Sequence, residues 1–365
     1  MRTRTVLIFG AGATKACGGP LTDEILPEAF GIYDSFPDFE REGFLELVNE
    51  FLVDYHHLPS AIQDRKVEDY VQLPLLLALL ETAIDRNEPL GRWPPDRLKT
   101  VRAGLDYLVF ALLQKKLERL DHNYYWDILR VVRGWGVTEP DVISLNYDII
   151  VDNSLCRLSE QEEGRLAFPD YGTDISTNAY HDFEHFGRLS KLHGSLHWIF
   201  CPGCKRLYLG MNDLKTGFVK VLEMLYHEDN LYERYSCHGS ACQNCGENVR
   251  PVLITPTYER DYANPHIRAA WDQARRMLRD ADRAIIIGYS LPHEDKDVTY
   301  LLRQELNHLD SAHLTVIDYD GAFRPGADDP RDHLRQHDVG RRYRTLFGDE
   351  LDWHPEGLQA WLASL

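Results

Sequence analysis

Four of the seven cysteines form two pairs, each with the Cys-x-x-Cys spacing of a metal-binding knuckle. Cys201 and Cys204 make the first pair, and Cys242 and Cys245 make the second. Two such knuckles can place four thiolates around one tetrahedral ion, which is the ligand set of a structural zinc site. Four protein ligands leave no open coordination position, so we expect this zinc to hold a fold together and to take no part in catalysis.

The other three cysteines lie outside the two knuckles. Cys237 lies between the two knuckles beside His238, and the sequence leaves open whether either residue replaces a zinc ligand. Cys17 and Cys156 are expected to be buried small apolar side chains. An odd number of cysteines, four of them in knuckles, suits a reducing compartment and a metal better than a disulfide framework.

A glycine-rich turn follows the first apolar run of the chain, because residues 10–14 are Gly-Ala-Gly-Ala-Thr. Glycines allow a backbone to approach a pyrophosphate closely, and amides ahead of a helix point at negative charge. The full Gly-x-Gly-x-x-Gly spacing is absent, because Ala13, Thr14 and Lys15 follow Gly12. An ordinary strand-to-helix turn therefore remains an alternative.

Polar side chains that could do chemistry follow other apolar runs. Asn146 and Asp148 come after the second run, where a carboxamide and a carboxylate could meet a ligand or simply cap a helix. His193 lies beside a glycine and could act as a general base near neutral pH, although a structural histidine is the commoner case. Asp318 ends a further run, where a carboxylate could accept from ribose hydroxyls or cap the next element.

The elements that must position these residues are buried strands. Continuous apolar, largely β-branched runs occupy Val6–Phe9, Val142–Leu145, Ala284–Ile287 and Leu314–Ile317. Such runs are typical of strands buried on both faces of a parallel sheet. Helical patterns lie between them, so the sequence predicts an α/β fold with a Rossmann-like parallel sheet that binds ligands outside the carboxyl ends of its strands.

Longer segments interrupt the alternation of strand and helix. Residues 39–135 are predicted to be a helical insertion, because apolar residues recur at helical spacing over Phe44–Leu52, Val67–Ile84, Val101–Leu120 and Tyr124–Val132. Pro74 should mark a helix start or a kink. Residues 200–250 are expected to form a small zinc-binding module and residues 320–365 a C-terminal extension, all within one catalytic unit spanning residues 1–365.

The amino-acid composition and the net charge limit the classes of protein to which this chain can belong. The 365 residues are 44% hydrophobic and carry a formal net charge of −18, which is enough apolar material for a sizeable core. This charge argues against a broad surface for nucleic acid or anionic membrane, because both need basic patches. No apolar run approaches the ~20 residues of a membrane helix, and Thr5–Phe9 is expected to be a strand rather than a signal peptide. We therefore expect a cytoplasmic protein.

The order of the motifs resembles the sirtuins over about residues 5–320. Gly-Ala-Gly follows the first strand, then come Asn-x-Asp, His-Gly-Ser leading into the first knuckle, a second knuckle followed by Val249-Arg250-Pro251, and Gly288-Tyr289-Ser290-Leu291-Pro292. Sirtuins have an NAD-binding Rossmann-type domain and a zinc module with the active-site cleft between them. They cleave the nicotinamide–ribose bond of NAD.

The resemblance implies a role for each matching residue. Asn146 would hold the nicotinamide ribose and the attacking group, Asp148 the nicotinamide carboxamide, and His193 would be the base. The phosphates and the other ribose contacts of NAD would be made by Gly10, Ala11, Gly12, Thr14, Gly288, Ser290 and Asp318.

Departures from the pattern point to one branch of the family. Gly19–Glu24 replaces the run that deacylating sirtuins carry after their glycines, and Pro256 lies where a peptide-pairing strand would need an amide donor. The helical insertion and Leu291-Pro292 are similar to the sirtuin-like proteins of bacterial antiphage defence. That branch hydrolyses NAD to nicotinamide and ADP-ribose, so the predicted function is an NAD+ hydrolase that depletes NAD in abortive infection. Glu68 and Asp69 also resemble that branch, although an exposed helix face is the favoured interpretation.

Other functions and partners follow from the same resemblance. A protein deacylase or ADP-ribosyltransferase is the alternative activity, and a non-catalytic NAD or ADP-ribose sensor is a third. An NAD hydrolase needs control, so we expect a homo-oligomer or a partner such as a hexameric DNA translocase, an Argonaute or a phage component. Direct contact with nucleic acid is not expected.

Overall fold

The computed structural model describes residues 3–35, 45–117, 120–176, 184–209, 241–242, 244–253 and 264–365. The chain divides into two compact units, and each is discontinuous in sequence. Unit 1 comprises residues 1–19, 120–195 and 258–365, and unit 2 comprises residues 20–119 and 196–257. Among the described residues, none of the helices combines the length and the apolar character that crossing a membrane requires.

Unit 1 is built on a sheet of seven strands in the order β10-β9-β8-β1-β2-β4-β3, and all of its paired neighbours are parallel. The strands are β1 (Thr5–Phe9), β2 (Asp141–Ser144), β3 (Phe168–Asp170), β4 (His185–Lys191), β8 (Arg283–Ile287), β9 (Leu314–Ile317) and β10 (Asp352–His354). The four predicted apolar runs are confirmed as the adjacent strands β2, β1, β8 and β9, and their side chains are almost all buried.

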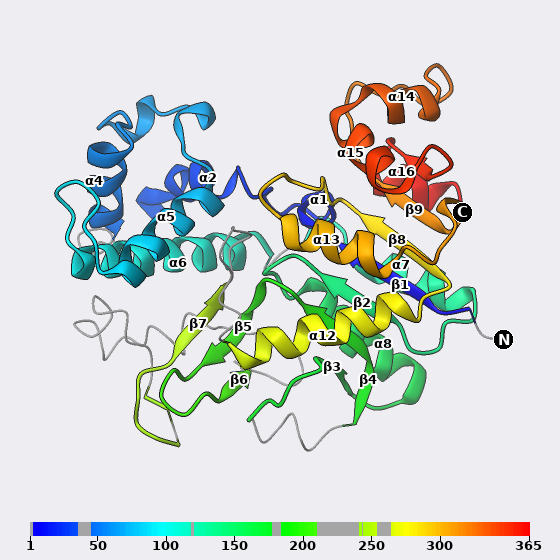
Figure 1. Ribbon diagram of the computed structural model, residues 1–365, viewed down its shortest axis with the longest axis horizontal. Helices are drawn as coiled ribbons and strands as arrows, with labels where there is room; N and C mark the ends of the chain where they lie inside the picture. Colours follow the sequence, from blue (N-terminus) through cyan, green and yellow to red (C-terminus); the bar gives the residue numbers. More distant parts are fainter. Residues whose placement is uncertain are drawn as a thin grey trace. The chain divides into compact units, whose positions relative to one another are not determined.

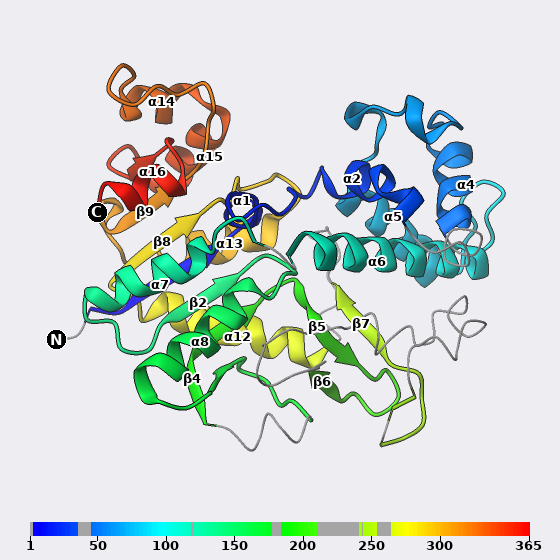
Figure 2. The same ribbon diagram turned by 180° about the vertical axis from the view of Figure 1, so that it is seen from behind.

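Helices cover both faces of this sheet. Figure 1 shows α12 (Pro265–Arg279) and α13 (Lys296–Glu305) on one face, and Figure 2 shows α7 (Tyr124–Gly134) and α8 (Ile150–Glu163) on the other. The short helix α1 (Ala11–Ala16) follows β1, while α14 (Pro330–Gln336), α15 (Asp338–Phe347) and α16 (Leu358–Ala363) flank β10. A parallel sheet with helices on both faces is Rossmann-like, as the sequence predicts.

The order of the strands reverses direction at the middle of the sheet. From β1 the chain moves outward through β2 to the edge strand β3, comes back to place β4 between them, and then places β8 on the other side of β1. Ligands of open α/β sheets bind in the crevice outside the carboxyl ends of the strands at such a reversal. The turns after β1 and β8 therefore border the expected binding position.

Unit 2 combines helices with a small sheet. Among its described residues, the α-helices are α2 (Ile25–Gly31), α4 (Glu46–Tyr55), α5 (Leu73–Arg86) and α6 (Pro95–Leu117). Three described strands lie in the order β6-β5-β7 and comprise β5 (Gly194–Phe200, whose first two residues belong to unit 1), β6 (Leu207–Leu209) and β7 (Arg250–Leu253).

Two boundaries differ from the sequence expectations. The helix expected from Val67 begins at Leu73 with Pro74 in its first turn, so Pro74 marks a helix start. Residues 67–69 form a separate 3₁₀ turn, in which Glu68 and Asp69 are exposed. The predicted insertion, residues 39–135, crosses the division between the units, because α4, α5 and α6 belong to unit 2 and α7 to unit 1.

Candidate functional site

The residues expected to bind NAD all follow strands of the main sheet at its carboxyl edge. The register pairs Phe9, the last residue of β1, with Ser144 on β2 and with Ile287 on β8. Ser144 is paired in turn with Lys191 on β4, and Ile287 with Ile317 on β9. The first positions beyond these five strands are therefore level, and they are Gly10, Leu145, Leu192, Gly288 and Asp318.

Asn146 joins the end of β2 to the glycine-rich turn after β1. Its Nδ2 lies 2.8 Å from the Gly10 carbonyl oxygen and 3.0 Å from Thr14 Oγ1. The Thr14 hydroxyl donates to Asp148 Oδ2 over 2.5 Å, and Asp148 Oδ1 accepts from the Ile150 amide over 2.9 Å. The structure thus brings three of the predicted residues, Thr14, Asn146 and Asp148, into one buried hydrogen-bond network.

Tyr125 of α7 belongs to the same network but was not predicted to. Its hydroxyl lies 3.0 Å from Thr14 Oγ1 and 3.0 Å from Asn146 Nδ2, and its ring packs on Phe9 with centroids 4.5 Å apart. Burial raises the pKa of Tyr125 well above its ordinary value of 10, so the hydroxyl keeps its proton. In the sequence Tyr125 is only one apolar position of an amphipathic helix, which gives no sign of this contact.

The carboxyl group of Asp148 is buried near the side chain of Lys191, which is also buried. Burial raises the pKa of Asp148, although the nearby Lys191 and the Thr14 hydroxyl both act to lower it. Lys191 is fully buried and donates from Nζ to the Asp148 carbonyl oxygen. It also lies 3.3 Å from Asp152 Oδ2, which completes a buried ion pair behind the end of β2.

His193 follows β4 by two residues and is 4% exposed. Its Nδ1 lies 2.8 Å from the carbonyl oxygen of Leu145, which can only accept a hydrogen bond. Nδ1 therefore carries a proton, and this bond fixes the orientation of the ring. The other ring nitrogen, Nε2, is buried and makes no hydrogen bond within the described residues.

The glycines of the two turns are required by the way the turns pack on each other. A Cβ on Gly10 would lie 2.5 Å from the Gly288 carbonyl oxygen, and one on Gly288 would lie 2.3 Å from the Ala13 amide nitrogen. The Gly10 amide donates to Ile287 and the Gly12 amide to Gly288. Packing alone thus accounts for the small residues at these positions, and their predicted contacts with phosphate stay predictions.

The remaining predicted NAD contacts lie around the same edge. Ser290 is exposed in the turn after β8, and its carbonyl oxygen accepts from Arg342. Asp318 is half-buried after β9, and burial raises the pKa of its carboxyl group. Ala11, at the start of α1, is half-buried. Their roles toward a ligand stay predictions.

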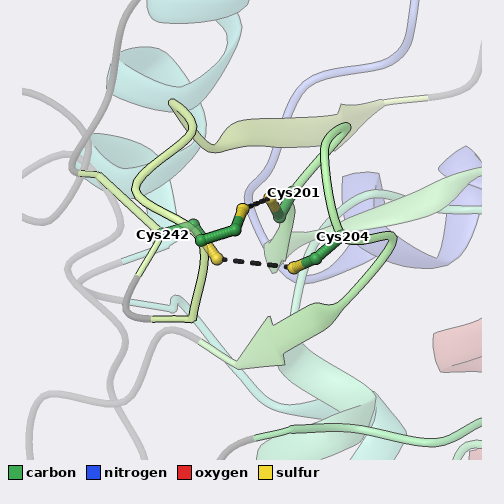
Figure 3. Close-up of side chains that lie close together, drawn as sticks. Cys201, Cys204 and Cys242 are labelled. Atoms are coloured by element: carbon green, nitrogen blue, oxygen red, sulfur yellow. Dashed lines mark hydrogen bonds between the residues drawn. The ribbon is translucent and has the colours of Figure 1, made fainter.

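The two knuckles come together in unit 2, as Figure 3 shows for Cys201, Cys204 and Cys242. The sulfur atoms of Cys201 and Cys245 lie 3.4 Å apart and those of Cys204 and Cys242 lie 3.6 Å apart, and all four lie within 4.8 Å of one another. Zinc–sulfur bonds of ~2.3 Å place the sulfurs of a tetrahedral site about 3.8 Å apart. The predicted four-cysteine cluster is confirmed, and its donor set fits zinc.

Local structure explains how the cluster forms. The first knuckle is the turn between β5 and β6, and the second precedes β7. Although burial acts to raise it, the pKa of Cys242 is lowered to about 6, because the Tyr208 hydroxyl and the amides of Asn244 and Cys245 donate toward its sulfur. Donors aimed at a thiolate are what a metal-bound sulfur requires. By contrast, burial raises the pKa of Cys17 to about 11, which agrees with an inert buried thiol.

A second group of potential metal ligands in the described part of the chain is Asp320, His333 and His337. Trp353 Nε1 donates to His333 Nδ1 over 3.1 Å, so the proton of that ring is on Nε2. His333 Nε2 then donates to Asp320 Oδ2 over 2.9 Å. Because a metal would need the lone pair of that Nε2, we interpret the group as a hydrogen-bonded cluster.

Some of the sequence expectations concern residues outside the described part of the chain. These are the competition of Cys237 and His238 for a zinc position and the effect of Pro256 on strand pairing.

Comparisons with known proteins give no family assignment. No family model matches the chain, and no curated protein matches it. Similar solved structures include a Sir2 homologue mutant in complex with ADP ribose, which is 12% identical over 99% of this chain and 90% of that chain, with a TM-score of 0.45. Another is Sir2 bound to acetylated peptide, which is 11% identical over 99% of this chain and 90% of that chain, with a TM-score of 0.41. Because these values are low, the assignment of a Rossmann-like fold rests on the strand order and the parallel pairings given above.

Proposed function

We propose that this protein is an NAD+ hydrolase that releases nicotinamide and ADP-ribose. The observation that carries the proposal is the position of His193 and Asn146, level with each other beyond β4 and β2 at the carboxyl edge of a Rossmann-like sheet. His193 has one ring nitrogen fixed by the Leu145 carbonyl, and its other ring nitrogen makes no hydrogen bond within the described residues. Fixing one nitrogen in this way is how a histidine is oriented as a general base.

The chemistry requires little beyond positioning and charge stabilisation. Nicotinamide leaves as a neutral molecule, so its departure needs no acid, and the ribose passes through an oxocarbenium-like state as in glycoside hydrolysis. A water on the vacated face must be oriented and must lose a proton. Asn146 Nδ2 is engaged with the glycine turn, so its Oδ1 would orient the water while His193 Nε2 accepts the proton, directly or through a ribose hydroxyl.

The surrounding residues would support this step. Thr14 and Asp148 would bind the ribose and the nicotinamide carboxamide, and both already lie in the network that holds Asn146. Gly10, Ala11, Gly12, Gly288, Ser290 and Asp318 would contact the phosphates and riboses of NAD. Zinc held by the four cysteines would stabilise unit 2 and take no part in the reaction.

The biological role we propose is NAD depletion in antiphage defence by a cytoplasmic protein. An NAD hydrolase that is always active would exhaust its cell, so activity would depend on self-association or on a partner. A hexameric DNA translocase, an Argonaute or a phage component are the partners that the resemblance suggests, and the charge of −18 agrees with leaving DNA contact to the partner.

The test is NAD consumption by the purified protein without any acyl-peptide, with nicotinamide and ADP-ribose measured as products. We expect His193→Ala and Asn146→Ala each to reduce turnover about 100-fold or more. His313→Ala, in an exposed 3₁₀ turn, is the matched control and should keep full activity.

Turnover within a few fold of wild type in both variants would overturn the assignment. Nicotinamide release that appears only with an acyl-lysine peptide would instead indicate the deacylase. NAD binding without turnover, in the presence of co-expressed partners, would indicate a sensor.

A further inference from the structure

A buried carboxylate faces the proposed catalytic base. His193 Nε2 is buried without a hydrogen-bond partner among the described residues, and it lies 3.4 Å from Asp295 Oδ2. Asp295 is only 1% exposed and lies just before α13. It was not among the predicted site residues, because an aspartate ahead of a helix has the sequence signature of a cap.

The carboxylate of Asp295 is not used as that cap. It occupies the N-cap position of α13, but its side chain makes no capping hydrogen bond to the helix. Instead, Asp295 Oδ2 accepts from the Tyr289 hydroxyl over 2.7 Å. Tyr289 is fixed in turn, because its carbonyl oxygen accepts from the buried Tyr343 hydroxyl over 2.6 Å. Asp295 is therefore held toward His193 from the turn after β8.

The surroundings of the two ring nitrogens of His193 indicate where the ring carries a proton and what a second proton would meet. Nδ1 already donates to the Leu145 carbonyl, so in a neutral ring Nε2 carries the lone pair, 3.4 Å from Asp295 Oδ2 but without a hydrogen bond to it. A proton taken up by Nε2 makes the ring a cation beside that buried carboxylate, which gives an ion pair inside the protein. Three groups of the described residues surround the His193 ring. They are the Asp295 carboxylate just before α13, the Leu145 carbonyl just after β2, and the Tyr147 ring, whose centroid lies 6.5 Å from that of His193.

We propose that Asp295 is a positioning residue that stabilises the imidazolium form of His193 during NAD hydrolysis. In the hydrolytic step, the bond between ribose C1′ and the nicotinamide nitrogen breaks, and nicotinamide leaves with the electron pair. The water oxygen forms the new bond to C1′, and the proton of that water passes to His193 Nε2. Asp295 compensates the positive charge until the proton leaves to solvent. The reaction step rests on the function proposed above, whereas the pairing of Asp295 with His193 does not.

The first experiment titrates His193 by NMR in the ligand-free protein, with His193→Gln used to identify its signal. Asp295→Asn keeps the shape and the acceptor for Tyr289 but removes the charge, so we expect the NMR titration of His193 to move to lower pH than in the wild type. Glu294→Gln removes a charge from the neighbouring position and should leave the titration unchanged.

A second variant separates this effect from general damage to the fold. Tyr289→Phe removes the hydrogen bond that stabilises the Asp295 carboxylate, so Asp295 should attract a proton on His193 more strongly, and the NMR titration should move to higher pH. Shifts in opposite directions in Asp295→Asn and Tyr289→Phe support the pairing. The same shift in both, or none in Asp295→Asn, overturns it.

Kinetics then test the reaction step. We expect Asp295→Asn to lower kcat for NAD about 10- to 100-fold with KM changed less, and to move the acidic limb of the kcat profile to lower pH. A change in KM alone would overturn the positioning role. If the wild-type protein cleaves no NAD, the proposed function fails, while the NMR titration still decides whether Asp295 acts on His193.

Discussion

Gly10 and Gly288 belong to motifs that suggest nucleotide binding, but the packing of the protein itself already requires glycine at both positions. Both lie at the reversal point of the sheet, where a nucleotide would be expected to bind. Their lack of a Cβ is needed because the turn after β1 rests directly on the turn after β8. A glycine motif therefore locates the place where a ligand can bind, but the glycines themselves need not touch it.

This explanation predicts a loss of stability rather than only a loss of binding. Gly10→Ala would place its Cβ 2.5 Å from the Gly288 carbonyl oxygen, so the two strand ends must separate. We expect the free energy of unfolding of the ligand-free protein to fall by about 1–3 kcal/mol, measured by denaturant titration. Gly134→Ala, whose Cβ would meet nothing within 4 Å, should have little effect. Unchanged stability in Gly10→Ala together with weaker NAD binding would assign the glycine to the ligand.

At the scale of elements, β10 extends the main sheet beyond what the sequence indicates. Residues 320–365 are expected to be an extension, yet Asp352–His354 pair in parallel with β9 at the edge of the sheet. His354 lies between two carboxylates, with Nε2 3.0 Å from Asp352 Oδ1 and Nδ1 3.0 Å from Glu356 Oε1. These charged contacts lie within the β10 segment, and β10 is joined to β9 by its backbone pairing and by Thr315, whose hydroxyl donates to Asp352 Oδ2 over 2.9 Å.

The stability of this edge should depend on pH in a defined direction. Burial acts to lower the pKa of His354, but Asp352 and Glu356 outweigh it and raise the pKa above 6.5. The protonated imidazole therefore stabilises the fold fully below pH 6.5, and this contribution is lost as pH rises through the folded pKa. We expect the difference in free energy of unfolding between wild type and His354→Gln to shrink from pH 6 to pH 9. In an Asp352→Asn background the dependence should be weaker, and a difference that grows with pH would contradict the assignment.

The elements that were predicted correctly share a physical property. β1, β2, β8 and β9 are buried on both faces and consist of continuous apolar runs, which periodicity can detect. By contrast, β4 contains polar residues such as Arg188, so its composition alone does not distinguish it from a loop. The side chain of Arg188 donates to Asp141 on β2, a contact that only the fold brings about. Local patterns cannot reveal a strand whose partners lie far along the chain.

The residues of the candidate site also differ in whether a local sequence pattern indicates them. Asn146, Asp148 and His193 could be proposed as site residues from the sequence because each lies next to a motif at a strand end. Tyr125 and Asp295 could not, because one resembles a core residue of a helix and the other a helix cap. Their contacts depend on tertiary packing between segments far apart in the sequence, as with Tyr125 and Thr14, which are 111 residues apart.

At the scale of the whole molecule, the two compact units have different sources of stability. Unit 1 has a seven-stranded sheet with helices on both faces, which buries a large apolar core. In the described part of unit 2 the sheet has three strands, and β6 comprises three residues, Leu207–Leu209, shortly after the first knuckle. Small sheets with little core need a further source of stability, and a metal is one that proteins use.

Removal of zinc should therefore act on unit 2 and spare unit 1. We expect one zinc ion per chain, and its removal by a chelator should increase amide hydrogen exchange in β5 and β6 while β1 and β2 stay protected. Cys242→Ser should reproduce this pattern without a chelator, whereas Cys156→Ala, in unit 1, should keep the metal. Equal loss of protection in β1 and β5 would show that the metal stabilises the molecule as one cooperative unit. No change in either would show that the four thiols close the knuckles without a metal.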